Sequence, residues 1–197
     1  MTTHTNISSI LHQNVIDIIL AGRNALKPLP SISGSKWAEQ YRYVSIESSL
    51  RSGKWNNDVV PYANEWMDVA TDPGVEEMTV WSSSQVGKTE TLLNIVGYYI
   101  HIDPSPILIL QPTLEMARAF SREKMEPMIR DTEVVRERVA RSKTRSEDNT
   151  ILHKRFIGGN LDIAGSNSPN SLAQRSKRIC ITDDADRCAS SAGNEGD

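Results

Sequence analysis

Apolar residues in the first third of the chain are spaced as in helices. Over residues 7–26 they recur every three to four positions, and residues 37–43 form a shorter segment of the same kind. Pro61 can open a third helix, which we expect to run to about residue 70. Residues 27–35, rich in proline and serine, separate the first helix from the others and have the composition of a linker.

Beyond residue 75 the pattern alternates between short apolar runs and helical spacing. The short runs are typical of strands and the longer segments of helices. The predicted strands cover residues 76–81, 107–111, 151–156, 161–164 and 179–184, and the predicted helices cover residues 91–100 and 113–128. Gly158, Gly159 and Asn160 signal a hairpin between the third and fourth strands. This alternation predicts an α/β fold with a largely parallel, buried sheet flanked by helices.

The composition is that of an ordinary globular protein. With 197 residues, 38% apolar and 24% charged, the chain can form one sizeable core, or one domain with an appendage. Its net charge of −3 means that any contact with nucleic acid must come from a local patch. No apolar run approaches the roughly eighteen residues that span a membrane, so we predict neither a membrane segment nor a signal peptide. Cys180 and Cys188 are better explained as reduced thiols than as a disulfide scaffold, which indicates a reducing compartment.

Residues 82–89, Ser-Ser-Ser-Gln-Val-Gly-Lys-Thr, carry the strongest chemical signal. The phosphate-binding P-loop pattern is Gly-x-x-x-x-Gly-Lys-Ser/Thr, and only Ser82 departs from it. Between a strand and a helix, the backbone N–H groups of such a segment can surround phosphates. We expect Lys88 to bridge the β- and γ-phosphates of ATP and Thr89 to bind Mg²⁺. The predicted nucleotide-binding residues are Ser83, Ser84, Gln85, Val86, Gly87, Lys88, Thr89 and Glu90.

Ser82 occupies the position where the P-loop pattern has its first glycine. If that position needs a positive φ, serine adds strain there. The alternative interpretation of the whole segment is a chance Gly-Lys-Thr after a strand, without a phosphate-binding role.

A second element supports the first. Residues 179–184 are predicted to form a buried strand that ends in two carboxylates, as a Walker B strand does. We expect Asp183 to hold Mg²⁺ and Asp184 to orient and polarise the attacking water, so that Asp184 and Lys88 are the catalytic candidates. The alternative is a strand that ends in solvated carboxylates.

Three further features have both a functional and an ordinary explanation. Tyr62 and Trp55 precede the P-loop and are candidate adenine contacts, or they pack in the core. Residues 111–113 form a turn that faces DNA in nucleic-acid motors, or they only cap a helix. The basic residues between 136 and 145 contact DNA, or they form a solvated helix face, since acidic neighbours dilute their charge.

Together these motifs resemble the large terminase subunit of lambda-like tailed phages. The likeness spans roughly residues 37–197 and depends on the order of several short segments. They are residues 53–62, Ser83 to Glu90, Gln111-Pro112-Thr113, residues 165–172, Arg175-Ser176, and Thr182-Asp183-Asp184-Ala185-Asp186-Arg187.

The resemblance implies an ATPase that pumps double-stranded DNA into a capsid shell, with ATP and Mg²⁺ as cofactors. It implies a homo-oligomeric ring on the capsid portal, a small terminase subunit as partner, and the bacterial host cytoplasm as location. The helix at residues 7–26 becomes the candidate contact for the small subunit. An arginine supplied in trans is worth ~10³–10⁵ in rate in such enzymes, and Arg175 is a candidate for an arginine sensor.

From the linker composition and the resemblance together we expect two parts. Residues 1–30 are predicted to be an N-terminal helical appendage and linker, and residues 31–197 a P-loop ATPase domain, truncated after the Walker B strand and lacking the family's nuclease domain. The family places glutamate at the position of Asp184, and a misplacement of about 1 Å can cost on the order of a hundredfold in rate. Two alternatives stay open: a helicase-like DNA translocase, and a non-catalytic prophage remnant that only binds nucleotide.

Overall fold

The computed structural model describes residues 14–16, 19, 32–47, 51–139, 150–167 and 176–188. Contacts divide the chain into residues 1–31 and residues 32–197. In the first unit, residues 14–16 and 19 are helical and exposed, and the rest of the helix predicted over residues 7–26 lies outside the described residues. The boundary between appendage and ATPase domain therefore stays a prediction.

Two helices and a small hairpin begin the second unit. Helix α2 (Gly34–Tyr41) and helix α3 (Tyr62–Ala70) confirm the helices predicted near residues 37–43 and 61–70. Between them, strands β1 (Tyr43–Val44) and β2 (Gly53–Lys54) pair antiparallel, and η1 (Asn57–Val59) forms a 3₁₀ turn. Helices α2 and α3 touch closely at Gly34, where an added Cβ would lie 2.5 Å from the carbonyl oxygen of Met67.

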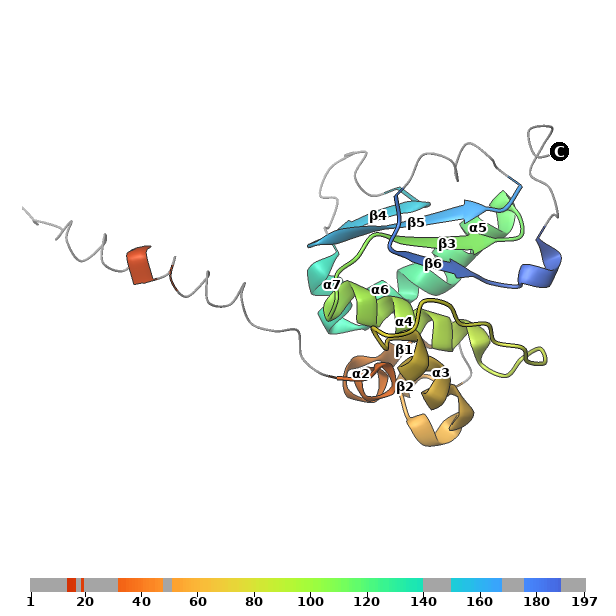
Figure 1. The fold of residues 1–197 in the computed structure, drawn as a ribbon, viewed down its shortest axis with the longest axis horizontal. Coiled ribbons are helices and arrows are strands. Elements are labelled where there is room, and N and C mark those ends of the chain that lie inside the picture. The colour runs from red at the N-terminus through yellow and green to blue at the C-terminus, as the bar shows by residue number, and fades with distance from the viewer. Residues whose placement is uncertain are drawn as a thin grey trace, which may run out of the picture. The chain divides into compact units, whose positions relative to one another are not determined.

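The main sheet has four strands in the order β4-β5-β3-β6 (Figure 1). Strands β3 (Ile107–Gln111), β5 (Gly159–Gly165) and β6 (Ile179–Thr182) are parallel, and β4 (His153–Phe156) pairs antiparallel with β5. Gly158, with φ of +91°, supplies the left-handed residue that the predicted hairpin needs. The fold is therefore α/β with a mixed, mostly parallel sheet.

The long predicted helices form, with one interruption. Helix α4 (Lys88–His101) extends the predicted helix in both directions. The segment predicted over residues 113–128 divides into α5 (Leu114–Phe120), a π-helical turn (Ser121–Met125) and α6 (Glu126–Asp131), followed by α7 (Glu133–Arg138). Pro127 explains the interruption. Proline has no backbone N–H to donate, and its ring crowds the carbonyl four residues earlier.

Helix α4 forms the centre of the core. Ten consecutive residues of α4, from Thr91 to Ile100, are buried. In Figure 1, α4, α6 and α7 lie on the same side of the sheet, and α2 and α3 pack against α4 from beyond. Gly97 permits the closest approach, since an added Cβ would lie 2.2 Å from the Trp37 ring and 2.7 Å from Cε of Met128. The core thus fixes where the first turn of α4 stands relative to the sheet.

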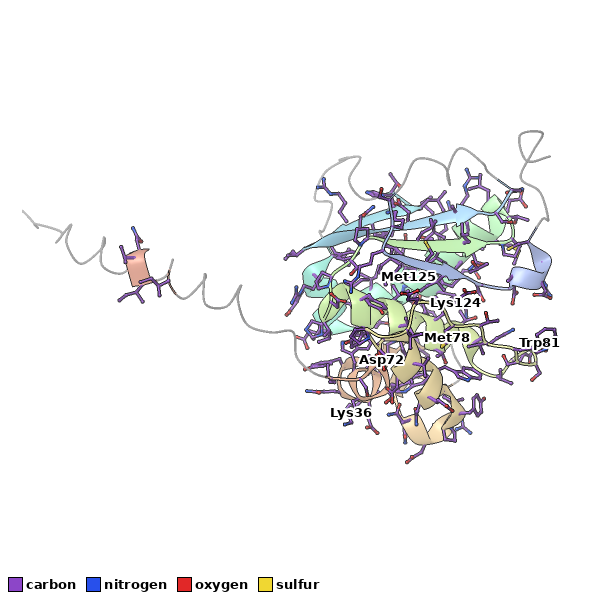
Figure 2. All side chains as sticks on the ribbon, in the orientation of Figure 1. Lys36, Asp72, Met78, Trp81, Lys124 and Met125 are labelled. Atoms are coloured by element: carbon purple, nitrogen blue, oxygen red, sulfur yellow. The ribbon has the colours of Figure 1, made fainter. Side chains whose placement is uncertain are left out.

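Two predicted strands differ from the structure. Residues 76–81 form no strand and pair with none of the strands that the structure describes, because a β-prone run becomes a strand only beside another backbone. Trp81 is 98% exposed, and Figure 2 shows it at the outer end of its segment. The strand at residues 179–182 does form, but among the described strands it pairs only with β3. The prediction of a buried strand was therefore wrong, and Cys180 is exposed.

Candidate functional site

The turn before α4 has the backbone of an anion-binding loop. Gln85 (φ 60°) and Gly87 (φ 83°) are both left-handed, and Gly87 caps the helix that begins at Lys88. The N–H and the hydroxyl of Thr91 both donate to the Gly87 carbonyl at 3.0 Å, which closes the first turn of the helix. Ser82 has no positive φ, so serine causes no strain at the first position of the motif.

Several amides of this turn have no acceptor in the part of the chain that the structure describes. Within the described residues, the backbone N–H groups of Ser84, Gln85 and Gly87 donate no hydrogen bond. They stand at the N-terminus of a fourteen-residue helix, whose dipole and own first amides also favour negative charge. This end of α4 can therefore bind a phosphate group.

The two predicted adenine contacts, Tyr62 and Trp55, differ in exposure. Tyr62 begins helix α3 and lies beside the same turn. The Tyr62 hydroxyl donates to the Val86 carbonyl at 2.9 Å, and the residue is 46% exposed. Trp55 is 8% exposed within the core, with its indole N–H bonded to Asn57 at 2.8 Å. The burial of Trp55 favours the packing interpretation, and the adenine contact stays a prediction for both residues.

Glu90 has a different role from the one predicted. Its Oε2 accepts from Arg42 at 2.8 Å, and the Arg42 side chain is fully buried. Burial lowers the pKa of Arg42, and the charge and hydrogen bond of Glu90 oppose that shift. Arg42 also donates to Asn94 at 3.0 Å, so its guanidinium joins the end of α2 to α4. The Glu90 carboxylate is therefore a structural anchor, and its prediction as a nucleotide contact stays a prediction.

The end of β6 provides the second half of the site. The Asp183 N–H donates to the Leu110 carbonyl at 3.0 Å, which continues the β3–β6 ladder. The Gln111 side-chain amide donates to Oδ2 of Asp183 at 3.2 Å, and Gln111 is only 3% exposed. Both the backbone and the side chain of Asp183 are thus held by β3.

Asp184 faces Lys88. Its Oδ1 lies 3.7 Å from Nζ of Lys88, and its Oδ2 lies 3.8 Å from Arg187. Asp184 has a left-handed backbone (φ 47°) at the turn into η3 (Ala185–Arg187), a conformation that aspartate tolerates better than most residues. The two predicted motifs, distant in the sequence, therefore meet in space.

The oxygen donors of this site suit a hard cation. Asp183 and Asp184 offer carboxylates and Thr89 a hydroxyl, the ligand types that Mg²⁺ prefers. Among the described residues no three His, Cys, Asp or Glu side chains gather as a metal site.

Sequence reasoning missed the groups that act on these motifs from other elements. Arg42 and Gln111, in its contact with Asp183, have no signature spacing, since each reaches its partner through the fold. Arg187 is only three residues from Asp184, within a segment that the sequence singled out, but its pairing with that carboxylate was not predicted. Arg175 and the basic residues between 140 and 149 lie outside the described residues. Of the rest of the basic stretch, Arg136 on α7 donates to the Arg130 carbonyl at 2.8 Å.

A separate cavity of about 440 Å³ opens at the other end of the sheet, where β3 begins. Its most buried polar group is Asp162, which contacts His153 at 2.6 Å, Asn160 at 3.0 Å and Lys177. These groups satisfy and neutralise one another, so the cluster ties β4, β5 and the segment before β6 together.

Comparison with known proteins identifies the family. Residues 49–197 match the model of the phage terminase large subunit gpA, ATPase domain. The chain belongs to this family. It is 30% identical to the terminase large subunit of Enterobacteria phage P21 over 67% of its own length and 20% of that protein. It is 28% identical to the terminase large subunit of Escherichia phage lambda over 78% of its own length and 24% of that protein.

The terminase family match covers both halves of the site, from the turn before α4 to the end of β6. The chain spans about a fifth to a quarter of the length of the curated terminases that it matches. No solved structure matches it. Within the described residues, no helix is both long and apolar enough to span a membrane.

Proposed function

We propose that this terminase ATPase domain binds ATP with Mg²⁺ between the turn before α4 and the end of β6, and hydrolyses it to drive DNA packaging. The contact between Lys88 and Asp184 is the observation that carries the proposal. It brings a phosphate-binding lysine, helix-terminal amides and two carboxylates to one place. We also propose that the domain is a P-loop NTPase, which the left-handed turn before α4 supports.

The mechanism follows from charge. The amides of the turn and the Lys88 ammonium would bind the β- and γ-phosphates and stabilise the charge that develops during transfer. Asp183 and Thr89 would hold Mg²⁺, which neutralises the phosphate oxygens when bound. Asp184 would orient the attacking water and accept its hydrogen bond.

The arrangement of Asp184 suggests how the site changes when it is loaded. The Asp184 carboxylate lies between two cations, Lys88 and Arg187. A triphosphate carries more negative charge than one carboxylate, so it would compete for Lys88. Asp184 would then turn toward the water. Arg187, whose side chain is 65% exposed, would keep the Asp184 carboxylate near the reacting phosphate.

We propose the partners from the family. The relatives are terminase large subunits, so double-stranded DNA, the capsid portal, a small terminase subunit and a homo-oligomeric ring in the host cytoplasm are the expected setting. An arginine from a neighbouring subunit and a base contact by Tyr62 belong to the same proposal. The second candidate function, nucleotide binding without turnover, is favoured by the short Asp184 side chain where glutamate is usual.

The test is phosphate release by the purified chain with Mg²⁺ and ATP, with and without DNA. We expect Lys88→Ala to abolish binding and turnover, and Lys36→Ala, an exposed lysine on α2, to change neither. Asp184→Asn should bind ATP without turnover, while Asp184→Glu should turn over at least as fast as the unchanged chain. Turnover that survives Lys88→Ala would refute the site, and binding without turnover in every form would support the second candidate.

A further inference from the structure

We infer that Gln111 is a positioning residue that sets the affinity of the site for Mg²⁺ by holding the Asp183 carboxylate. The inference rests on the proposed function, because it assigns a partner to the carboxylate proposed to hold the metal. It goes further in naming a residue, outside both motifs, on which metal binding depends.

The register of the sheet brings the two side chains together. Strands β3 and β6 are parallel and pair Leu110 with Thr182, so Gln111 at the end of β3 stands beside Asp183, the residue that directly follows β6. Side chains at paired positions of parallel strands point to the same face of the sheet. The resulting contact joins residues 72 positions apart, from Nε2 of Gln111 to Oδ2 of Asp183 at 3.2 Å.

A neutral donor suits this task better than a cation. The carboxamide restricts the orientation of Asp183 through one oxygen and leaves the full negative charge for a metal at the other. A lysine or arginine there would compete with the metal for the same charge. The neighbouring carboxylate, Asp184, shows the contrast, since both its oxygens face cations.

The backbone of Gln111 is itself held in place. Its carbonyl accepts from the Ser166 N–H at 2.8 Å, and the Pro112 carbonyl accepts from the Ser166 hydroxyl at 2.9 Å. Beside them Gly165 lies so close to α5 that an added Cβ would stand 2.4 Å from the Leu114 nitrogen. Because the backbone of Gln111 is fixed and the residue is only 3% exposed, its carboxamide has little freedom to leave Asp183 for solvent.

The expected effect is on metal binding. Loss of a hydrogen-bond partner of a metal ligand typically weakens metal affinity about 10–100-fold. Gln111→Leu keeps the volume of the side chain and removes the donor. We expect the Mg²⁺ concentration for half-maximal binding of a fluorescent ATP analogue to rise about 10–100-fold in Gln111→Leu. Binding of the same analogue in EDTA should be unchanged, because Lys88 and the loop amides are intact.

Two controls separate positioning from general damage. Ser166→Ala removes only the hydroxyl bond to the Pro112 carbonyl. It keeps the Ser166 N–H bond to Gln111 and does not touch Asp183, so it should leave the Mg²⁺ midpoint unchanged. The electron paramagnetic resonance signal of Mn²⁺, titrated into the complex with the analogue, reports the metal without any turnover and should show the same weakening in Gln111→Leu.

The outcomes distinguish the inference from the proposed function. Metal-dependent binding by the unchanged chain, with an unshifted midpoint in Gln111→Leu, would overturn the inference and leave the function standing. An equal shift in Gln111→Leu and Ser166→Ala would also overturn it, since edge stability would then be the cause. Absence of nucleotide binding by the unchanged chain would refute the proposed function, and the role of Gln111 with it.

Discussion

The buried pair of Arg42 and Glu90 gives the sharpest test of the fold around the site. Arg42→Met keeps an apolar chain of similar length and removes the guanidinium. It leaves a carboxylate with 16% of its side chain exposed, and Oε1 of that carboxylate has no partner within the described residues. Removing one member of a buried ion pair typically costs 3–5 kcal/mol. Because some solvent reaches Glu90, we expect a loss of about 3 kcal/mol in the free energy of unfolding.

The assay is equilibrium unfolding in urea, with thermal unfolding beside it. A loss of this size should lower the melting temperature by roughly 6–12 °C in a chain of this length. The double variant Arg42→Met with Glu90→Met removes the stranded carboxylate and should recover part of the loss. Arg130→Met is the matched control, since Arg130 pairs with Glu47 at the surface, where both side chains are more than half exposed.

Two results would refute this reasoning. If Arg42→Met destabilised the chain no more than Arg130→Met, the buried charge would not be the dominant effect. If the double variant were less stable than Arg42→Met alone, the stranded carboxylate would not be the cause of the loss. If both variants behave as expected, the first turn of α4 is anchored to the end of α2 through the Arg42–Glu90 pair.

Two further predictions concern the packing of α4. Gly97→Ala should lower the free energy of unfolding by about 1–3 kcal/mol, because the added Cβ has no room beside the Trp37 ring. Gly74→Ala, at an exposed turn, is the control and should be nearly neutral in thermal unfolding. Equal effects of the two variants would contradict this packing. His101 accepts the Trp37 indole N–H at 3.1 Å, and burial, followed by the charge of Arg138, lowers the pKa of His101 below 6.5. The unfolded chain then binds the proton first, so the contribution of His101 is complete above pH 6.5 and is lost as pH falls through the lower pKa of the folded state. His101→Gln can still accept the Trp37 hydrogen bond but does not titrate in this range. In urea titrations it should lose less stability than the unchanged chain between pH 7 and pH 5. Identical pH profiles would refute the role of His101.

The sequence by itself determined what depends on neighbours along the chain. Helices α3 and α4, strand β3 and the β4–β5 hairpin were predictable, because helical and strand spacing are local properties and Gly158 marks the turn. The turn before α4 was predictable for the same reason, since its glycine and lysine positions are fixed within eight residues. The family match covers the residues that this local reasoning singled out.

Only the tertiary structure decided which distant residues meet. Arg42 reaches Glu90 across 48 positions and Gln111 reaches Asp183 across 72, and no periodicity in the sequence records either contact. Trp55 and the segment at residues 76–81 show that the local sequence also leaves burial and strand pairing open. An aromatic ring can be buried or exposed, and a β-prone run becomes a strand only if another strand pairs with it. The physical reason is that burial and backbone pairing are properties of the assembled core, whereas propensity belongs to the segment.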